Sequence, residues 1–150
     1  PERRELAKLV GADYVYDPRE VRAGEVLQEL SKGLGFHMHV EAAGEPLVTV
    51  PEMMQSLNVA AQIVQIGRAA QMVPMYLESL QVRRGRVYGS QGHSGHGTFP
   101  NVINMVASGR LDLSPLITSR YELDDTVNAI AQSTTRKDGK IMVFPNGFLK

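Results

Sequence analysis

The sequence predicts an α/β protein in which parallel strands are joined by helices. Between residues 2 and 66, stretches of helical periodicity alternate with short apolar runs suited to buried strands. Glycine stands at the ends of two of these runs, at Gly44 and Gly67, and at the end of a later predicted strand, at Gly89. Because the connections are short and alternate regularly, they favour crossover helices between parallel strands.

The first helix is expected over residues 2–10, where leucine and valine recur at helical spacing before Gly11. Residues 13–16 then favour a short strand. A second helix is expected from Asp17 and Pro18, which suit an N-cap and a first helical turn, as far as Gly33.

The next strand is expected over residues 36–43. Thr49 can cap a third helix with Pro51 in its first turn, and Leu57 belongs to the apolar face of that helix. A further strand is expected over residues 62–66, where the pattern stops at Gly67.

After Gly67 the alternation breaks, because residues 72–82 are apolar without a clear period. The remaining pattern predicts strands over residues 86–88, 117–121 and 140–144, helices over residues 99–106 and 124–132, and a glycine-rich loop over residues 89–97. A change in composition near Leu116 suggests two domains, 1–115 and 116–150.

Composition excludes several function classes. The chain has 150 residues, of which 43% are hydrophobic, so it can form one globular domain or a large part of a larger one. Sixteen basic residues balance 16 acidic ones, which argues against nucleic acid as a partner. The sequence has no cysteine for disulfides or thiolate zinc ligands, and no apolar run long enough to cross a membrane. We therefore expect a cytoplasmic protein with no membrane partner.

Histidines are the most conspicuous polar groups. His93 and His96 could ligate a metal, but no carboxylate or thiol lies nearby, and zinc needs three or four protein ligands. Ser94 lacks the second glycine of a Gly-x-Ser-x-Gly nucleophile turn, so this stretch is better interpreted as a flexible loop over a ligand. His37 and His39 share one face of a strand, where satisfied core histidines are the commoner case.

Two other polar features remain open. Glu41 stands at the end of a predicted strand and is either buried or turned toward solvent. Arg83, Arg84 and Arg86 form a short basic run, which is more often a solvated turn than a phosphate clamp.

The glycines at the strand ends favour ligand binding. In an open parallel sheet, ligands bind at the carboxyl ends of the strands, and glycine there lets a ligand approach the backbone. The Gly-x-Gly-x-x-Gly turn that seats a pyrophosphate on a helix N-terminus is absent from the sequence.

Seven stretches, taken together, resemble the zinc-type medium-chain alcohol dehydrogenase family. They are residues 5–15, 40–44, 63–67, 89–92, 105–112, 115–118 and 139–143. They follow the order of the family and cover nearly the whole chain. The loop over residues 89–100 is most similar to members that act on polyols or cyclitols, the inosose-type dehydrogenases.

The resemblance implies that the chain is the C-terminal part of such an enzyme. Its fold would be a partial Rossmann-like parallel sheet with flanking helices, without the first strand and the glycine-rich turn, followed by a short C-terminal α+β segment. The zinc-binding, GroES-like portion would lie before Pro1, so no catalytic or metal-ligating residue is assigned to this chain. The cofactor would be NAD or NADP, bound weakly or not at all by the isolated chain.

The resemblance also implies site residues and a partner. Residues 71–84 correspond to a segment that forms the subunit interface of the family through edge strands, so a homo-oligomer is expected. The residues that match cofactor contacts of the family are Arg3, Ala42, Ala43, Gly44, Ile66, Gly67, Arg68, Ser90, Gln91, Gly92 and Lys140.

Three functions follow from these patterns. The leading hypothesis is the C-terminal half of a zinc-dependent, NAD(P)-linked dehydrogenase of a small alcohol or polyol, inactive by itself. A second is a non-catalytic oligomerisation or interaction module from a truncated reading frame. A third is a complete flavodoxin-like domain that binds a nucleotide such as flavin through its glycine strand ends.

Overall fold

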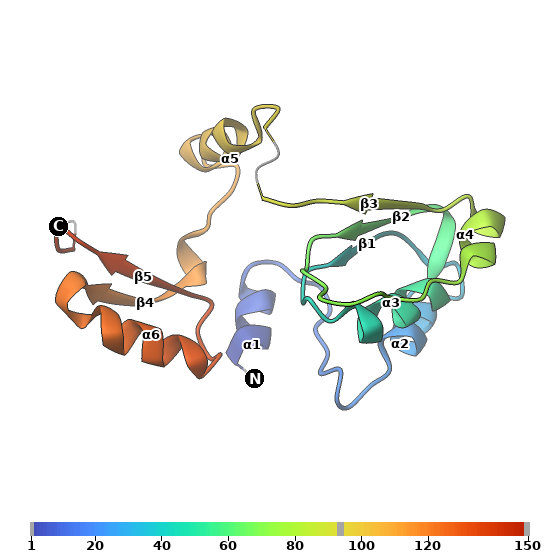
Figure 1. Ribbon diagram of the computed structural model, residues 1–150, viewed down its shortest axis with the longest axis horizontal. Coiled ribbons are helices and arrows are strands. Elements are labelled where there is room, and N and C mark those ends of the chain that lie inside the picture. The colour runs from blue at the N-terminus through green and yellow to red at the C-terminus, as the bar shows by residue number, and fades with distance from the viewer. Residues whose placement is uncertain (1, 93–94, 149–150) are drawn as a thin grey trace. The chain divides into compact units, whose positions relative to one another are not determined.

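The computed structural model describes residues 2–92 and 95–148 (Figure 1). By its contacts the chain divides into two units, Tyr16–His96 and Pro1–Val15 together with Gly97–Lys150. The expected division into 1–115 and 116–150 separates a cofactor-binding part from a C-terminal segment. Contacts within the chain do not test that division, so it stays a prediction. Each unit is described by itself.

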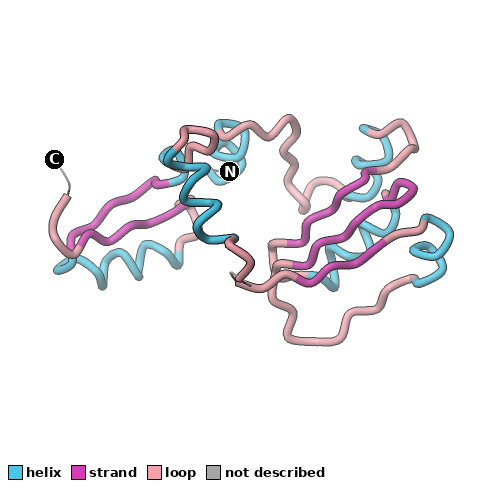
Figure 2. Tube along the Cα trace, turned by 90° about the horizontal axis from the view of Figure 1, so that it is seen from above, coloured by secondary structure: helices cyan, strands magenta, loops and turns pink. Residues whose placement is uncertain are grey.

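A parallel three-stranded sheet forms the centre of unit Tyr16–His96. Its strands β1 (Phe36–Glu41), β2 (Leu57–Gln65) and β3 (Arg86–Gly89) lie side by side in chain order. Helix α3 (Pro46–Gln55) connects β1 to β2, and α4 (Leu77–Arg83) connects β2 to β3 (Figures 1 and 2). The predicted α/β class with parallel strands and crossover helices is confirmed.

The strand order also bears on the third hypothesis. In a flavodoxin-like sheet the strand order reverses at a switch point, giving the order 2-1-3-4-5. The described residues form a three-stranded sheet in the order β1-β2-β3, without such a reversal, and a separate two-stranded sheet, β4-β5. The chain therefore does not form a complete flavodoxin-like domain, and that hypothesis was wrong.

The small core of this unit lies between β2 and its helices. Leu57, Ala61 and Ile63 are buried, and Met53 and Leu80 are among the partly buried side chains packed against them. Helix α3 packs on β1 and β2, α4 contacts β2, and α2 (Ala23–Leu30) packs on α3. Burial of this apolar surface holds the helices on the sheet.

Strand β2 begins earlier than the sequence predicts. Phe36 pairs with Leu57 but Met38 pairs with Gln62, so the register shifts over a bulge that contains Ala60 at φ 59°. Leu57, which was expected on the face of a helix, is a strand residue with 3% exposure. A bulge breaks the alternation from which a strand is recognised in a sequence.

Two helix starts also differ from the prediction. Helix α2 begins at Ala23 because Asp17 instead closes a turn, where its carboxylate accepts the backbone N–H of Arg19 at 3.0 Å. Helix α3 begins at Pro46, so Thr49 and Pro51 lie inside it rather than at its start.

Two expected strands are absent from their segments. Residues 13–16 have no strand assignment in the structure. The expectation of edge strands in residues 71–84 was wrong, because Leu77–Arg83 forms helix α4, which ends at Arg84 with φ 53°. The helix is short, and residues 72–76 before it are mainly apolar and include Pro74, so the segment shows no clear helical period.

The other unit contains a helix–strand arrangement near the C-terminus. Strands β4 (Ile117–Glu122) and β5 (Lys140–Phe144) pair in parallel, and α6 (Thr126–Thr134) connects them and packs on both. Helices α1 (Glu2–Leu9) and α5 (Thr98–Ala107) complete it. The predicted C-terminal α+β segment and the helix over residues 99–106 are confirmed, to within a few residues at the ends.

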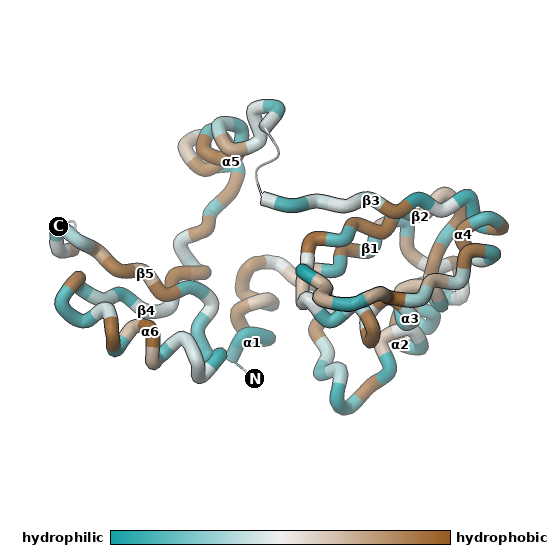
Figure 3. Tube along the Cα trace, viewed as in Figure 1, coloured by the Kyte–Doolittle hydropathy of each residue, from teal (hydrophilic) through white to brown (hydrophobic). Residues whose placement is uncertain are grey.

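Helix α5 carries a hydrophobic stripe without burying it. Hydrophobic residues recur along the helix (Figure 3), yet none of its residues is buried. Among the residues that the structure describes, no helix is both long and apolar enough to cross a membrane.

Candidate functional site

The carboxyl ends of β2 and β3 enclose an open hollow of about 660 Å³. Because the two strands are parallel, the loops that follow them leave the sheet at the same edge. The hollow is lined by Gln65, Ile66, Gly67, Arg68, Gly89, Ser90 and Gln91. The structure thus brings together five of the predicted contact residues, those of the two segments 66–68 and 90–91.

A buried carboxylate connects the loops at this edge of the sheet through hydrogen bonds. Glu41, the last residue of β1, is 1% exposed. Its Oε1 accepts the backbone N–H groups of Ala43 and Gly44, each at 3.0 Å, and that of Glu45 at 3.4 Å. Ala43 and Gly44 lie in the turn between β1 and α3, and Glu45 is the N-cap of α3. The carboxylate therefore satisfies the backbone of the turn that leads into α3.

The same residue joins the loop after β2. The Gln65 amide nitrogen donates to Glu41 Oε2 at 2.8 Å and to the Gly67 carbonyl oxygen at 2.6 Å. The Glu41 carbonyl oxygen accepts the N–H groups of Ile66 and Gly67, both at 2.8 Å. The third loop is attached as well, since the Ser90 N–H donates to the Gln65 carbonyl oxygen at 2.9 Å.

Glycine is required at this junction for reasons of space. A Cβ on Gly67 would overlap the Glu41 carboxylate and the main chain of Gly44. Gly44 itself has φ +78°, which favours glycine, and a Cβ there would lie 3.3 Å from the Arg68 carbonyl oxygen. The two glycines let the loops after β1 and β2 touch.

The remaining predicted contacts are placed as follows. Ala42 and Ala43 are exposed after β1, but the N–H groups of Ala43 and Gly44 are already bound to Glu41. Gly92 is exposed, follows the lining residues and has φ +56°. Whether any of these residues contacts a cofactor stays a prediction.

Arg3 and Lys140 belong to the other unit. The Arg3 Nε donates to the Asp138 carbonyl oxygen at 2.9 Å. Lys140 begins β5 and lines a hollow of about 380 Å³ whose other members are mainly apolar, among them Leu116 and Met142.

Asp138 organises the polar contacts of that unit. Its carboxylate accepts hydrogen bonds from Ser119 at 2.5 Å, Thr118 at 2.8 Å and Gln132 at 2.9 Å. The hydroxyl of Ser119, followed by that of Thr118, lowers the pKa of Asp138. Because these donors favour the charged form, Asp138 ties β4, α6 and β5 together as an anion.

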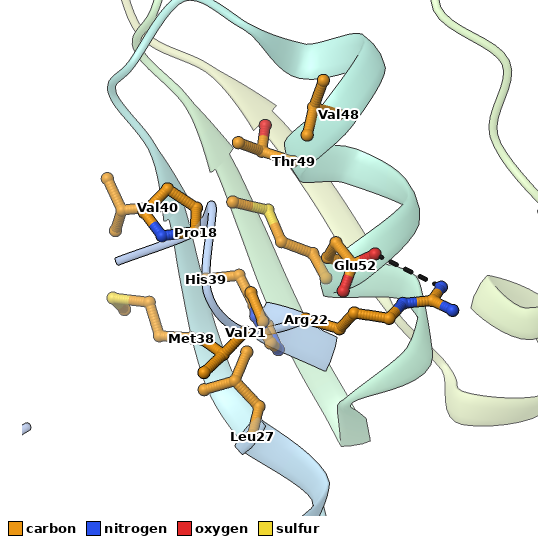
Figure 4. A pocket seen from close by; sticks show the side chains of 12 residues that line it. Pro18, Val21, Arg22, Leu27, Met38, His39, Val40, Val48, Thr49 and Glu52 are labelled. Atoms are coloured by element: carbon orange, nitrogen blue, oxygen red, sulfur yellow. Dashed lines mark ion pairs between the residues drawn. The ribbon is translucent and has the colours of Figure 1, made fainter. Parts of the chain in front are cut away.

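A second hollow of about 400 Å³ lies between β1, α2 and α3 (Figure 4). Met38, Val40, Leu27 and Val48 give it a mainly apolar lining. At its rim the Arg22 guanidinium lies 3.6 Å from the Glu52 carboxylate.

His39 lies on this second hollow and is a core histidine. It is 6% exposed, and its Nε2 lies 3.2 Å from the Ser56 carbonyl oxygen. Burial lowers the pKa of His39, although main-chain hydrogen bonds at Ser56 and Phe36 oppose the shift. The interpretation of His39 as a satisfied core residue agrees with this geometry, whereas His37 is exposed.

Metal binding finds no support within the described ranges 2–92 and 95–148, where no three His, Cys, Asp or Glu side chains gather as possible ligands. His93 and Ser94 lie outside the described residues. His96 is described and has φ 52°.

The sequence does not predict the two residues that connect the loops at this edge. It leaves Glu41 either buried or exposed to solvent, and it gives Gln65 no role beyond its place in a strand. The available signal was a lone acidic residue that ends an apolar strand just before two alanines and a glycine. A carboxylate there can accept hydrogen bonds from the backbone N–H groups of the turn that leads into the next helix.

A parallel sheet with glycine loops and an open hollow at its carboxyl edge defines the class of α/β proteins that bind ligands at the ends of their strands. The family comparison is more specific. The chain belongs to the zinc-binding dehydrogenase family, whose model matches residues 1–108.

Individual relatives agree with the family. Scyllo-inosose 3-dehydrogenase of Thermotoga maritima is 37% identical over 139 residues, which cover 90% of this chain and 35% of that protein. L-threonine 3-dehydrogenase of Thermococcus kodakarensis is 28% identical over 146 residues, covering 96% of this chain and 41% of that protein. A solved structure from Thermotoga maritima, named as an alcohol dehydrogenase, has a TM-score of 0.86 at 35% identity, covering 95% of this chain and 37% of that chain.

These comparisons confirm the resemblance drawn from the sequence, including its narrower similarity to inosose-type dehydrogenases. They also confirm a partial Rossmann-like fold. The chain spans between 35% and 41% of the length of these three relatives.

Proposed function

We propose that this chain supplies the nicotinamide side of the cofactor cleft in a zinc-dependent, NAD(P)-linked dehydrogenase of secondary alcohols or polyols. The observation that carries the proposal is the hollow at the ends of β2 and β3, lined by residues 66–68 and 89–91. It lies outside the carboxyl ends of the strands, which is the edge of an open parallel sheet where ligands bind.

The described residues at the hollow suit the nicotinamide end of a dinucleotide. Gly89 has open space around the position of a Cβ, so a flat ring can approach its backbone. Arg68 is exposed at the rim, where its guanidinium can pair with a phosphate. The described residues provide no three-ligand group for zinc, so we assign no zinc ligand to them.

The role of the chain is therefore to bind and orient. When bound, a nicotinamide ring supplies the hydride acceptor for oxidation of an alcohol. The backbone of residues 66–68 and 89–91 would fix the plane of that ring, and the Glu41 network keeps this backbone in place. Orientation of this kind contributes to rate by holding the reacting atoms in line.

The names of the relatives support a secondary alcohol as the substrate class. Both scyllo-inosose 3-dehydrogenase and L-threonine 3-dehydrogenase are named for oxidation at a carbon inside their substrates. The higher identity to the inosose enzyme supports a polyol or cyclitol. Because this chain covers less than half of each relative, we assign no substrate contacts to the parts of those proteins that it does not match.

The test is an NMR titration of the ¹⁵N-labelled 150-residue protein with NAD, NADP and nicotinamide mononucleotide. We expect millimolar binding, with amide shifts concentrated at residues 66–68 and 89–92. The proposal would be refuted by shifts confined to unit Pro1–Val15 with Gly97–Lys150. It would also be refuted by the absence of shifts up to about 10 mM ligand, roughly the weakest affinity expected of half a cleft.

A matched pair of variants sharpens this test. Ser90→Glu places a negative charge on the hollow and should weaken binding of the anionic nucleotides by roughly threefold or more, a change of about 0.7 kcal/mol. Ser108→Glu adds the same charge at another exposed serine and should leave binding unchanged. Equal effects of both variants would indicate a general charge effect and no site.

Exposed apolar residues favour a second role for the chain, self-association through residues 71–84. Within this segment Met72 is 96% exposed, and Leu77 and Val82 are each 71% exposed. Large apolar side chains gathered on a surface typically mark a protein interface. We propose that a second copy of the chain covers them, forming a homo-oligomer.

Sedimentation velocity tests the oligomer. The wild-type protein should sediment as a dimer or larger species, and Val82→Asp should shift it toward monomer. Val127→Asp changes a residue that is 77% exposed on α6 and should not alter the oligomeric state. A monomeric wild-type protein at every concentration tested would rule out this interface.

A further inference from the structure

A charged side chain with almost no exposure needs an explanation in this chain. Glu41 is 1% exposed, and a glutamate is rarely buried to this extent unless it has partners. The hydrogen-bond donors found for its carboxylate are neutral: three backbone N–H groups and the Gln65 amide. Neutral donors compensate the buried charge through hydrogen bonds alone.

The three backbone donors belong to the turn between β1 and α3. Ala43 and Gly44 precede the helix, and Glu45 is its N-cap. Because the Glu41 carboxylate accepts hydrogen bonds from all three, it holds this turn in place from within the protein. Ligand contacts at this edge are therefore expected from the loops after β2 and β3.

The same carboxylate controls where one of those loops lies. Its Oε2 holds the Gln65 amide, which in turn holds the Gly67 carbonyl oxygen, and Gly67 has no room to move closer. Gln65 and Gly67 both line the hollow. A displacement of Glu41 is therefore passed on to the backbone that lines the hollow.

We propose that Glu41 is a positioning residue that sets the loop over residues 65–68 against the turn over residues 43–45 and so shapes the nucleotide hollow. The part of this proposal that concerns the ligand rests on the proposed function. Glu41 acts through Gln65 and Gly67 and does not itself line the hollow.

Glu41→Gln is the direct test, because the amide retains one acceptor oxygen but presents an N–H₂ group to the Gln65 donor. We expect amide hydrogen exchange at Gly44, Ile66 and Gly67 to accelerate by about tenfold, the loss typical of a hydrogen bond to a charged group. Exchange at Ile63, in the middle of β2, should stay within about twofold of the wild-type rate, because the core does not depend on Glu41.

Glu52→Gln is the matched control. Glu52 is another glutamate of the same unit; it is partly buried, and its carboxylate accepts the Gly24 N–H at 2.6 Å. This variant should leave exchange at residues 43–45 and 65–68 unchanged. Should Glu41→Gln fail to fold, Gln65→Leu removes the side-chain hydrogen bonds to Glu41 Oε2 and to the Gly67 carbonyl oxygen but keeps those from residues 43–45 to Glu41. It should accelerate exchange at residues 66–68 while sparing Ala43.

Titration with nicotinamide mononucleotide then separates the two proposals. Weaker amide shifts at residues 66–68 and 90–91 in Glu41→Gln than in Glu52→Gln support positioning of the hollow. If the wild type shows no shifts but Glu41→Gln still accelerates exchange only in the two loops, loop positioning stands and the proposed function fails. Unchanged loop exchange, or equal acceleration throughout the sheet, would overturn the positioning role.

Discussion

Gly67 lies so close to the carboxylate of Glu41 that a single added methyl group would overlap it. The contact joins the loop after β2 to the last residue of β1, and the two residues also share a hydrogen bond from the Gly67 N–H to the Glu41 carbonyl oxygen at 2.8 Å. At this one contact the loops after β1 and β2 leave no space for an additional methyl group.

Gly67→Ala should destabilise the protein by about 2 kcal/mol or more, because the new methyl group must displace a buried carboxylate or the main chain of Gly44. Chemical denaturation measures the change. Gly89→Ala is the control: the space around Gly89 is open, and its free energy of unfolding should change by roughly 0.5 kcal/mol at most. Equal effects would contradict the close packing.

Stability should fall as the pH drops from about 7 toward 5 because of His39. Burial lowers its pKa in the folded state, whereas the unfolded chain takes up a proton near pH 6.5. The unfolded state therefore binds more protons in this range, and acidification favours it. Urea denaturation at both pH values measures how much unfolding free energy is lost in acid. His39→Gln should reduce this loss, whereas His37→Gln, which changes an exposed residue of the same strand, should leave it as in the wild type. An equal loss in both variants would show that other groups cause it.

Asp138→Asn should lower the thermal midpoint of the unit that contains β4, α6 and β5. The asparagine oxygen can still accept the hydrogen bonds of Ser119 and Thr118, which share one carboxylate oxygen, but without the negative charge. The amide nitrogen that replaces the other oxygen cannot accept the hydrogen bond of Gln132. Since these donors hold the pKa of Asp138 low, its contribution is present above about pH 4 and is lost as the pH falls through the lowered value. Differential scanning calorimetry at pH 7 and pH 3 should therefore show a difference between variant and wild type that shrinks in acid.

The 150-residue chain should show no zinc-dependent oxidation of polyols. A catalytic zinc needs three protein ligands, and the sequence has no cysteine. The part of the chain that the structure describes gathers no such ligand group either. Reduced nicotinamide formation with myo-inositol or sorbitol, zinc and NAD should equal the rate without protein. A rate above this background would disprove the prediction that the 150-residue chain is inactive by itself.

Much of the fold was predictable because its elements carry local signals. Strand β5 begins and ends where the apolar run over residues 140–144 predicts, and the parallel class follows from the alternation of helices and strands. The errors share one cause. Local contacts and backbone angles determine the bulge at Ala60, the turn at Asp17 and the extent of helix α4. Such features leave no periodic pattern of apolar residues in the sequence.

The same division holds for the site. By itself the sequence determined the family, the class of fold and the glycines at the strand ends, because spacing and residue type are properties of the chain alone. Only the tertiary structure decided that Glu41 turns inward, that Gln65 links it to Gly67, and that residues 66–68 and 90–91 share one hollow. Hydrogen bonds between residues distant in the chain depend on which strand ends become neighbours, and that pairing exists only once the sheet has formed.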